Sequence, residues 1–217
     1  MLSACGGGGG GGGSATTTVA STNAFDVSSG YRRLISTGFQ KTFTVGGGCS
    51  GTLALSAAPA TTSATFEGTN GVSAIDVATI NFTNCTPASS SSSETRYYDT
   101  NYVPLGKSST NEYSVYIGTS TLPSTARVGD AGIVGSQNTF TNNTKATSTG
   151  RDDTSYAMEA DTATTAILNL ITKTYNTSGI LTVTEQNRYR VAADGTLTFI
   201  SFDLQRSGTS TLRLTGN

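Results

Sequence analysis

The stretch that decides the fold is "TAILNLITKTYNTSGILTVTEQNRYRVAADGTLTFISFDLQR", residues 165–206. It divides into three strand-like segments at "NTSG" (176–179) and "ADG" (193–195). Asp-Gly supplies the positive φ that a tight hairpin needs, and β-branched and aromatic side chains are frequent between the turns. Residues 165–206 therefore predict an antiparallel meander of long strands.

Alternation of side chains along the segments supports this meander. The second segment places one set on one face: Leu181, Val183, Tyr189 and Val191. The third does the same with Thr198, Ile200, Phe202 and Leu204. We assign residues 97–217 to a C-terminal antiparallel β region that forms a curved meander sheet, a sandwich or an open barrel. A helix that begins at Ala160–Thr162 is the alternative for the first segment.

The N-terminal half contains shorter strand candidates, each bounded by Gly, Pro or Asn, at 51–56, 63–67 and 76–84. "YRRLISTGFQKTFTV" (31–45) adds one or two strands. We expect residues 30–88 to form a small β unit, which makes the whole chain all-β. Pro87 and the run of serines after it predict a solvated, Ser-rich loop at residues 89–96, between this unit and the C-terminal region.

The composition excludes several classes of function. The 217 residues carry a net charge of −1, so the chain has no basic excess with which to bind nucleic acid. It contains no histidine, which removes Ser-His-Asp and Cys-His catalysis and His-ligated zinc. No stretch approaches the roughly 18 apolar residues of a membrane-spanning helix. We expect no cofactor, no metal, no nucleic-acid partner and no enzymatic activity.

The three cysteines fall into two groups. Cys49 and Cys85 are predicted to form a disulfide that ties the end of a strand to the turn "GGG" (46–48). A catalytic or metal-binding thiol pair would need partners that the sequence does not show. Cys5 stands apart, in "LSAC" (2–5) before eight glycines.

"LSAC" resembles the lipobox of bacterial lipoproteins, and the resemblance implies that Cys5 is the lipidation site. Residues 1–4 are then a remnant of a signal peptide, and Gly6, which is not Asp, implies the outer membrane. Residues 5–29 contain too few apolar side chains to fold and are expected to be a disordered tether with a reach of about 27 Å. The alternative is a free thiol in a disordered tail.

The chain also resembles uncharacterised lipoproteins of Gram-negative bacteria. The resemblance rests on "LSACGGGGG", on "FTNCTP" and "YYDTNYVPLG", and on the tail "EADTATTAILNLITKTYNTSG" with "EQNRYRV". It implies a lipid-anchored protein at the outer membrane, facing the periplasm or the cell surface. It implies no functional residues.

The densest aromatic and polar cluster is the candidate ligand site: Tyr97, Tyr98, Asp99, Asn101 and Tyr102. Tyrosines beside Asp and Asn suit contact with a glycan or a peptide, because they offer stacking faces and hydrogen bonds. The structural alternative is a Tyr-rich loop that covers the end of a sheet. A second group consists of carboxylates that could bind Ca²⁺ or serve a hydrolase: Asp130, Asp152, Asp153, Glu159 and Asp161.

Three functions follow as hypotheses. The first is a non-catalytic, lipid-anchored envelope protein with a structural or partner-binding role. The second is binding of a glycan or a small apolar ligand, through the tyrosines or through the inside of the curved sheet. The third is a carboxylate-dependent hydrolase, which requires two carboxyl groups within about 5–10 Å of each other in a cleft.

Overall fold

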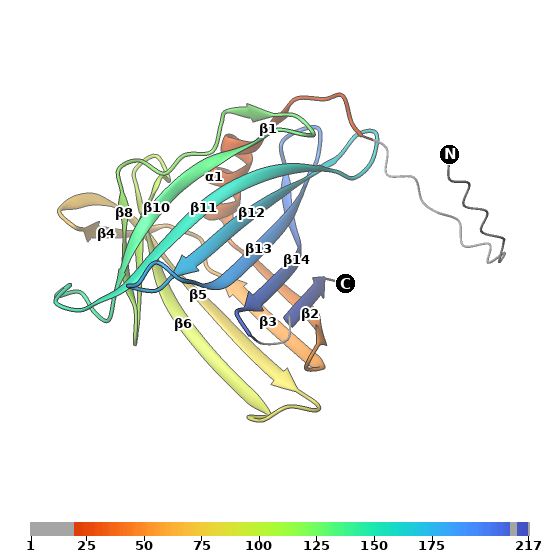
Figure 1. Cartoon of the computed structure of the whole chain (residues 1–217). Helices are drawn as coiled ribbons and strands as arrows, with labels where there is room; N and C mark the ends of the chain where they lie inside the picture. Colours follow the sequence, from red (N-terminus) through yellow and green to blue (C-terminus); the bar gives the residue numbers. More distant parts are fainter. Residues whose placement is uncertain (1–19, 209–211, 217) are drawn as a thin grey trace, which may run out of the picture.

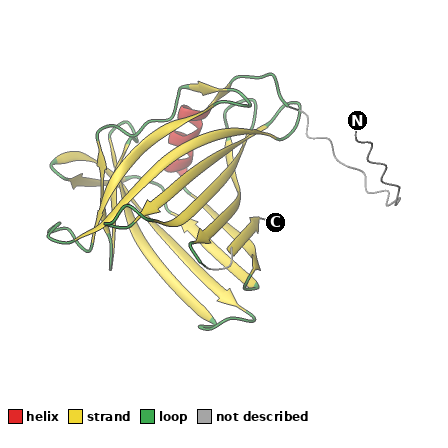
Figure 2. Ribbon diagram, viewed as in Figure 1, coloured by secondary structure: helices red, strands yellow, loops and turns green. Residues whose placement is uncertain are grey.

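The computed structural model describes residues 20–208 and 212–216, and Figure 2 shows that these residues form mainly strands. One helix and fifteen strands make up this part of the chain. Their bounds are β1 (Phe25–Asp26), α1 (Val27–Thr37), β2 (Phe39–Gly47), β3 (Gly51–Ala57), β4 (Thr62–Phe66), β5 (Thr69–Phe82), β6 (Ser89–Asp99), β7 (Pro104–Ser109), β8 (Tyr113–Ile117), β9 (Thr125–Ala126), β10 (Ala131–Phe140), β11 (Ser148–Ala160), β12 (Ala166–Tyr175), β13 (Leu181–Val191), β14 (Leu197–Arg206) and β15 (Leu212–Gly216).

Thirteen of the strands form one antiparallel sheet, which has the shape of a barrel (Figure 1). The order is β3-β2-β15-β14-β13-β12-β11-β10-β8-β7-β6-β5-β4. Strand β5 is long enough to pair with β4 through its first half and with β3 through its second half. Because β3 also pairs with β2, the sheet curves back on itself. β1 and β9 form a separate two-stranded ribbon.

The predicted all-β antiparallel fold is confirmed. Strands β11 to β15 form the meander, each paired with the next. The alternative helix near Ala160–Thr162 is wrong, because the chain enters β12 at Ala166 and pairs with strands on both sides. The predicted single face of β14 is also wrong. A bulge opposite Arg188 and Tyr189 shifts the alternation, so that Phe199 is buried on the inner face before the bulge.

The predicted Ser-rich loop at residues 89–96 is wrong, because these residues lie in strand β6. Ser89 pairs with Asn81 and the register continues without a break to Asp99. Side chains 89–93 are exposed, so the pairing with β5 and not burial keeps this part extended. Cross-strand contacts such as that of Thr79 Oγ1 with Ser91 Oγ, at 3.1 Å, support it.

Helix α1 replaces the predicted end of the tether and the predicted strand after Tyr31. Asp26 caps it, because its carboxylate accepts a hydrogen bond from the Ser29 N–H at 3.0 Å. Val27, Tyr31 and Leu34 share one helical face and pack against the core. Phe25 is fully buried, so the folded part begins before Ser29. The tether prediction for residues 5–19, and Cys5 with it, lies outside the described residues.

The strands of residues 30–88 and those of residues 97–217 belong to the same sheet. β2 pairs with β15, and β5 pairs with β6 along eleven residue pairs. Cys49 and Cys85 form the predicted disulfide, which joins the turn after β2 to the turn after β5. The disulfide-tied strands are therefore part of the barrel wall.

The core lies between the inner face of the sheet and α1. Its largest fully buried apolar side chains include Phe25, Phe43 and Leu168. The ring of Phe199 is 5.1 Å from that of Phe43, edge to face, and 4.8 Å from that of Tyr189, stacked. In Figure 1 the helix lies within the curve of the sheet, behind β10 and β11. No helix among the described residues is long and apolar enough to cross a membrane.

Candidate functional site

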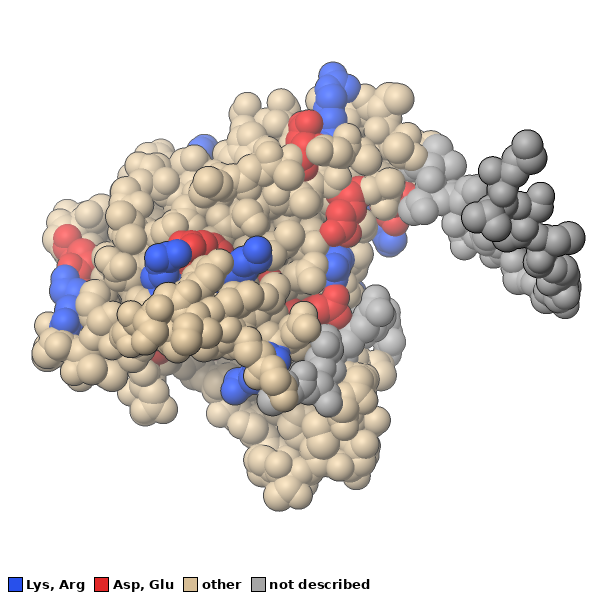
Figure 3. Space-filling view, viewed as in Figure 1, with Lys and Arg blue, Asp and Glu red and all other residues tan. Residues whose placement is uncertain are grey.

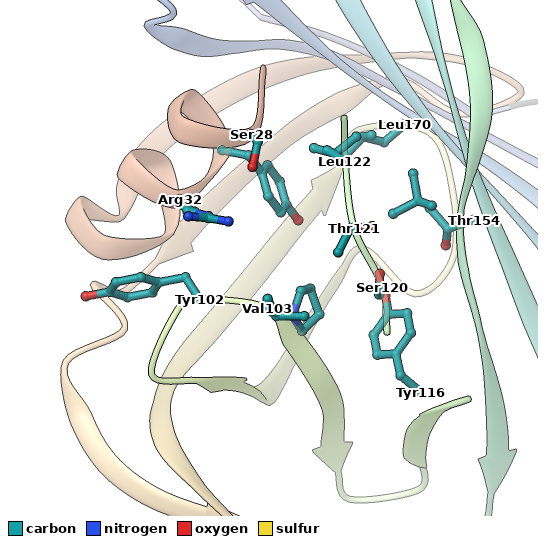
Figure 4. A pocket seen from close by; sticks show the side chains of 13 residues that line it. Ser28, Arg32, Tyr102, Val103, Tyr116, Ser120, Thr121, Leu122, Thr154 and Leu170 are labelled. Carbon is teal, nitrogen blue, oxygen red and sulfur yellow. The ribbon is translucent and has the colours of Figure 1, made fainter. Parts of the chain in front are cut away.

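A cavity of about 80 Å³ lies between α1 and the inner face of the sheet. Figure 4 shows Ser28 and Arg32 of α1 on one side, and Ser120, Leu122 and Thr154 across the space. The remaining walls are formed by the segment before β7 and by β7, β8, β10 and β12. The lining residues are Ser28, Tyr31, Arg32, Tyr102, Val103, Pro104, Tyr116, Ser120, Thr121, Leu122, Val134, Thr154 and Leu170.

The geometry of α1 places three side chains at this cavity. Ser28, Tyr31 and Arg32 are three and four residues apart, so they lie on the same side of the helix. Gly30 determines how closely α1 approaches the turn between β13 and β14, because a Cβ at position 30 would overlap the backbone carbonyl of Gly195. The absence of a side chain at Gly30 therefore lets α1 rest directly on the turn between β13 and β14.

The walls of the cavity are apolar, with hydroxyl groups at a few points. Leu122, Val134 and Leu170 supply aliphatic surface. Ser120 is only 2% exposed, and its hydroxyl has no hydrogen-bond partner among the described residues, although it is near enough to Tyr116 to lower the pKa of that phenol. A buried hydroxyl without a partner is unfavourable. The cavity thus offers a ligand both apolar contact and an unsatisfied polar group.

Two tyrosines at the cavity, Tyr31 and Tyr116, stay protonated at neutral pH. Burial raises the pKa of Tyr31 to about 12, against the opposing effect of the Arg96 charge. Burial also raises the pKa of Tyr116, again against Arg96. Both phenols can therefore act as hydrogen-bond donors to a ligand.

An ionic cluster lies on the inner face next to these tyrosines. Arg96 Nε is 2.8 Å from Asp76 Oδ2, and Arg96 Nη2 is 2.6 Å from Glu94 Oε1. Lys107 Nζ is 3.0 Å from Glu112 Oε1 and 3.6 Å from Glu94 Oε2. The Arg96 side chain is 44% exposed, although it shares the inner face with buried Tyr98.

Within the cluster, the pKa values of the Asp76 and Glu94 carboxyl groups shift in opposite directions. The Arg96 charge lowers the pKa of Glu94 to about 2, against the effect of burial. Burial raises the pKa of Asp76 more than Arg96 lowers it. Both carboxylates are held by the same guanidinium, so they are close together, as a hydrolase would require, but each is already bound to a cation.

Glu94→Gln is expected to lower the free energy of unfolding at pH 7 by about 2 kcal/mol. The pKa of Glu94 is lower in the folded protein than its ordinary value of 4.5, so its ionised form stabilises the fold above pH 4.5. This contribution is lost as the pH falls from 4.5 to about 2. Urea unfolding of both proteins between pH 7 and pH 2 measures it, and the difference should vanish at the acid end.

The control for that series is Asp153→Asn, which removes an ion pair with Arg151 at the exposed outer face. An exposed pair contributes little, so this variant should change stability by less than about 1 kcal/mol. A difference between Glu94→Gln and the unaltered protein that stays constant down to pH 2 would contradict the assignment.

The structure separates the predicted tyrosine cluster. Tyr98 is buried on the inner face, whereas Tyr97 stacks on Phe66, with 4.4 Å between the ring centres. Asp99 forms the turn, because its carboxylate accepts hydrogen bonds from the backbone N–H groups of Asn101 and Val103. Tyr102 lines the cavity, with its ring directed away from Ser120 in Figure 4. Of the five predicted residues, only Tyr102 reaches the cavity.

The predicted carboxylates lie on both faces of the sheet. Asp152 is buried and accepts a hydrogen bond from Gln137, whereas Asp153 faces outward toward Ser136 and Arg151. Asp161 pairs with Arg190, and Glu159 accepts a hydrogen bond from Asn169. Within residues 20–208 and 212–216, no three His, Cys, Asp or Glu residues lie together as a metal site would require.

The residues of α1 that line the cavity were missed by the sequence analysis. The signal that could have found them is Asp26 as an N-cap followed by Val27, Tyr31, Leu34 and Ile35 at helical spacing. Ser120 to Leu122 lie in an irregular segment, so only the tertiary structure brings them to the site.

On the face that Figure 3 shows, charged side chains do not indicate another site. On the face in Figure 3, acidic and basic side chains lie beside one another, and most of the face carries neither.

No protein-family model, no curated protein and no solved structure matches the chain. The fold and the site therefore define its class: a barrel-shaped, antiparallel β protein with a helix on its inner face and a small cavity beneath that helix.

Proposed function

We propose that this chain is a non-catalytic binding protein, held at the bacterial outer membrane through lipid on Cys5, which takes a small and largely apolar ligand into the cavity beneath α1. The observation that carries the proposal is the cavity itself, with aliphatic walls and the buried, unpartnered hydroxyl of Ser120. Pockets of this kind combine apolar area with a few polar groups that orient the ligand. The cavity's size suits a molecule with about one ring or a short aliphatic chain.

We do not propose a hydrolase, because the two carboxylates on the inner face are already engaged in ion pairs. Asp76 and Glu94 are both engaged by Arg96, and the ion pair of Glu94 favours a permanently ionised form. A glycosidase-like pair needs one carboxylic acid that gives up its proton to the substrate. The pair on the inner face is better suited to holding β5 and β6 together.

Filling the cavity tests the proposal. Ser120→Leu removes the unpartnered hydroxyl and adds apolar volume to the space that the ligand would occupy. Benzyl alcohol and benzamide, followed by ligand-detected NMR and by the shift in melting temperature, are the probes. We expect both to bind the unaltered protein and to lose most of their affinity in Ser120→Leu.

The matched control is Ser136→Leu, in which a serine on the outer face of β10 is replaced in the same way. This variant should bind the probes as the unaltered protein does. Equal binding of the probes by Ser120→Leu and by the unaltered protein would contradict the proposed site.

The lipid anchor is tested separately. The support for it is the resemblance of "LSAC" to a lipobox, together with the glycines that follow. A Gly-rich segment there would serve as a flexible linker between the membrane and the folded part. Mass spectrometry of the N-terminal peptide from the native protein should show cysteine 5 as the first residue, with acyl chains attached. An N-terminal peptide with an unmodified Cys5 would remove the anchor from the proposal and leave the cavity unaffected.

A further inference from the structure

We propose that the ligand is a small carboxylate whose charged group pairs with Arg32 at the mouth of the cavity, while its ring or short chain occupies the space beneath α1. This inference rests on the proposed function and adds to it the chemical class of the ligand. It is carried by the position of Arg32, by the absence of a partner for its side chain within residues 20–208 and 212–216, and by the kind of side chains around it.

Among the residues that the structure describes, Arg32 is the positively charged side chain that lines the cavity, and no acidic side chain lines it. Arg32 is exposed, and its guanidinium makes no ion pair or hydrogen bond with any described residue. In Figure 4 its side chain extends from α1 toward the space that Thr121 and Ser120 face. A cation in this position can receive an anion without breaking an existing contact.

Other cations near the cavity or on α1 are already engaged. Arg96 is held by Asp76 and Glu94. Arg33, the neighbour of Arg32 on α1, donates to the hydroxyl of Thr196 at 3.4 Å and does not line the cavity. Arg32 therefore differs from both, because it lines the cavity and its guanidinium donates to no residue in the described part of the chain.

The planar guanidinium suits a carboxylate because it can donate two parallel hydrogen bonds. A carboxylate at Arg32 would remain near water, so it would not pay the desolvation penalty of a buried charge. The apolar body of the same molecule would then contact Leu122, Val134 and Leu170. A hydroxyl or carbonyl on that body could pair with the buried hydroxyl of Ser120, which has no hydrogen-bond partner among the described residues.

The test compares benzoate with its neutral counterpart benzamide and with acetate, by NMR titration at low ionic strength. We expect benzoate to bind the unaltered protein about tenfold more tightly than benzamide, because hydrogen bonds to charged groups are the stronger ones. Acetate, which lacks the apolar body, should bind more weakly than benzoate. Arg32→Gln should lower the affinity for benzoate about tenfold and leave that for benzamide unchanged.

Two further variants make the result specific. Arg33→Gln removes a neighbouring charge of the same sign and should leave benzoate binding unchanged, apart from the small effect of net charge. Arg32→Lys keeps the charge without the planar fork and should retain part of the affinity for benzoate. Because Arg32 is exposed, neither substitution at this position disturbs the core.

The outcomes separate this inference from the proposed function. If benzamide and benzyl alcohol bind in the cavity but benzoate binds no better, or if Arg32→Gln and Arg33→Gln weaken benzoate equally, the role of Arg32 is overturned and the proposed function stands. If neither the neutral probes nor benzoate binds, both are overturned.

Discussion

Gly30→Val is expected to lower the free energy of unfolding by about 3 kcal/mol and to abolish benzoate binding. The cause is steric, because a side chain at position 30 would overlap the carbonyl of Gly195 and approach Leu197. Neither neighbour can give way easily, since Gly195 lies in a tight turn at φ +78° and Leu197 is buried in the core. The helix must therefore move away from the sheet.

Displacement of α1 would carry Ser28, Tyr31 and Arg32 away from the cavity, so stability and binding should fall together. Urea unfolding followed by circular dichroism measures the first, and NMR titration with benzoate measures the second. The matched control is Ser29→Val, which places the same β-branched residue at the adjacent, exposed position of α1. If Gly30→Val and Ser29→Val were equally stable and bound benzoate equally, α1 would not rest on the turn as described.

The double variant Cys49→Ser, Cys85→Ser is expected to lower the free energy of unfolding by about 4 kcal/mol. The disulfide closes a loop with a sequence separation of 36. In the chain-entropy model, removing the disulfide raises the conformational entropy of the unfolded chain and so stabilises the unfolded state relative to the folded one. The link also holds together the turns at one end of the β2–β3 and β5–β6 hairpins. Fraying at that end of the barrel should accompany the loss.

Urea unfolding with and without a thiol reductant measures the contribution of the disulfide, in a Cys5→Ser background so that the third cysteine cannot exchange. The reductant should destabilise the protein that retains Cys49 and Cys85, and should have no effect on the double variant. Unfolding at the same urea concentration in both redox states would contradict a stabilising role for the link.

The strands of the meander could be predicted because each has its own local pattern. In β13, for example, Val183, Tyr189 and Val191 share one face as predicted, and "ADG" marks the hairpin to β14. Leu181 was predicted on the same face, but a register shift between Leu181 and Val183 interrupts the alternation there. Strand β11 was not predicted, because Asp152 and Asp153 obscure its apolar alternation. The inner face of β11 becomes evident only from its pairing with β12, in which Met158 lies opposite Leu168 and Tyr156 lies opposite Leu170.

The cavity could not be predicted, for a physical reason. Its lining comes from α1, from the segment before β7, from the segment after β8 and from five strands (β7, β8, β10, β11 and β12), so no short stretch of sequence contains its pattern. The tyrosine cluster predicted as a site lies on consecutive residues of β6 and of the turn after it. Consecutive strand residues point to opposite faces, which explains why Tyr97 and Tyr98 are separated.

The most direct test of the account is an intermolecular NOE measurement on benzoate bound to the unaltered protein. We expect contacts between the ring protons of benzoate and the methyl groups of Leu122, Val134 and Leu170, and their loss in Arg32→Gln at the same benzoate concentration. Contacts that are instead made only with exposed apolar side chains of the outer surface, such as Ile75 and Val77, would contradict a binding site beneath α1.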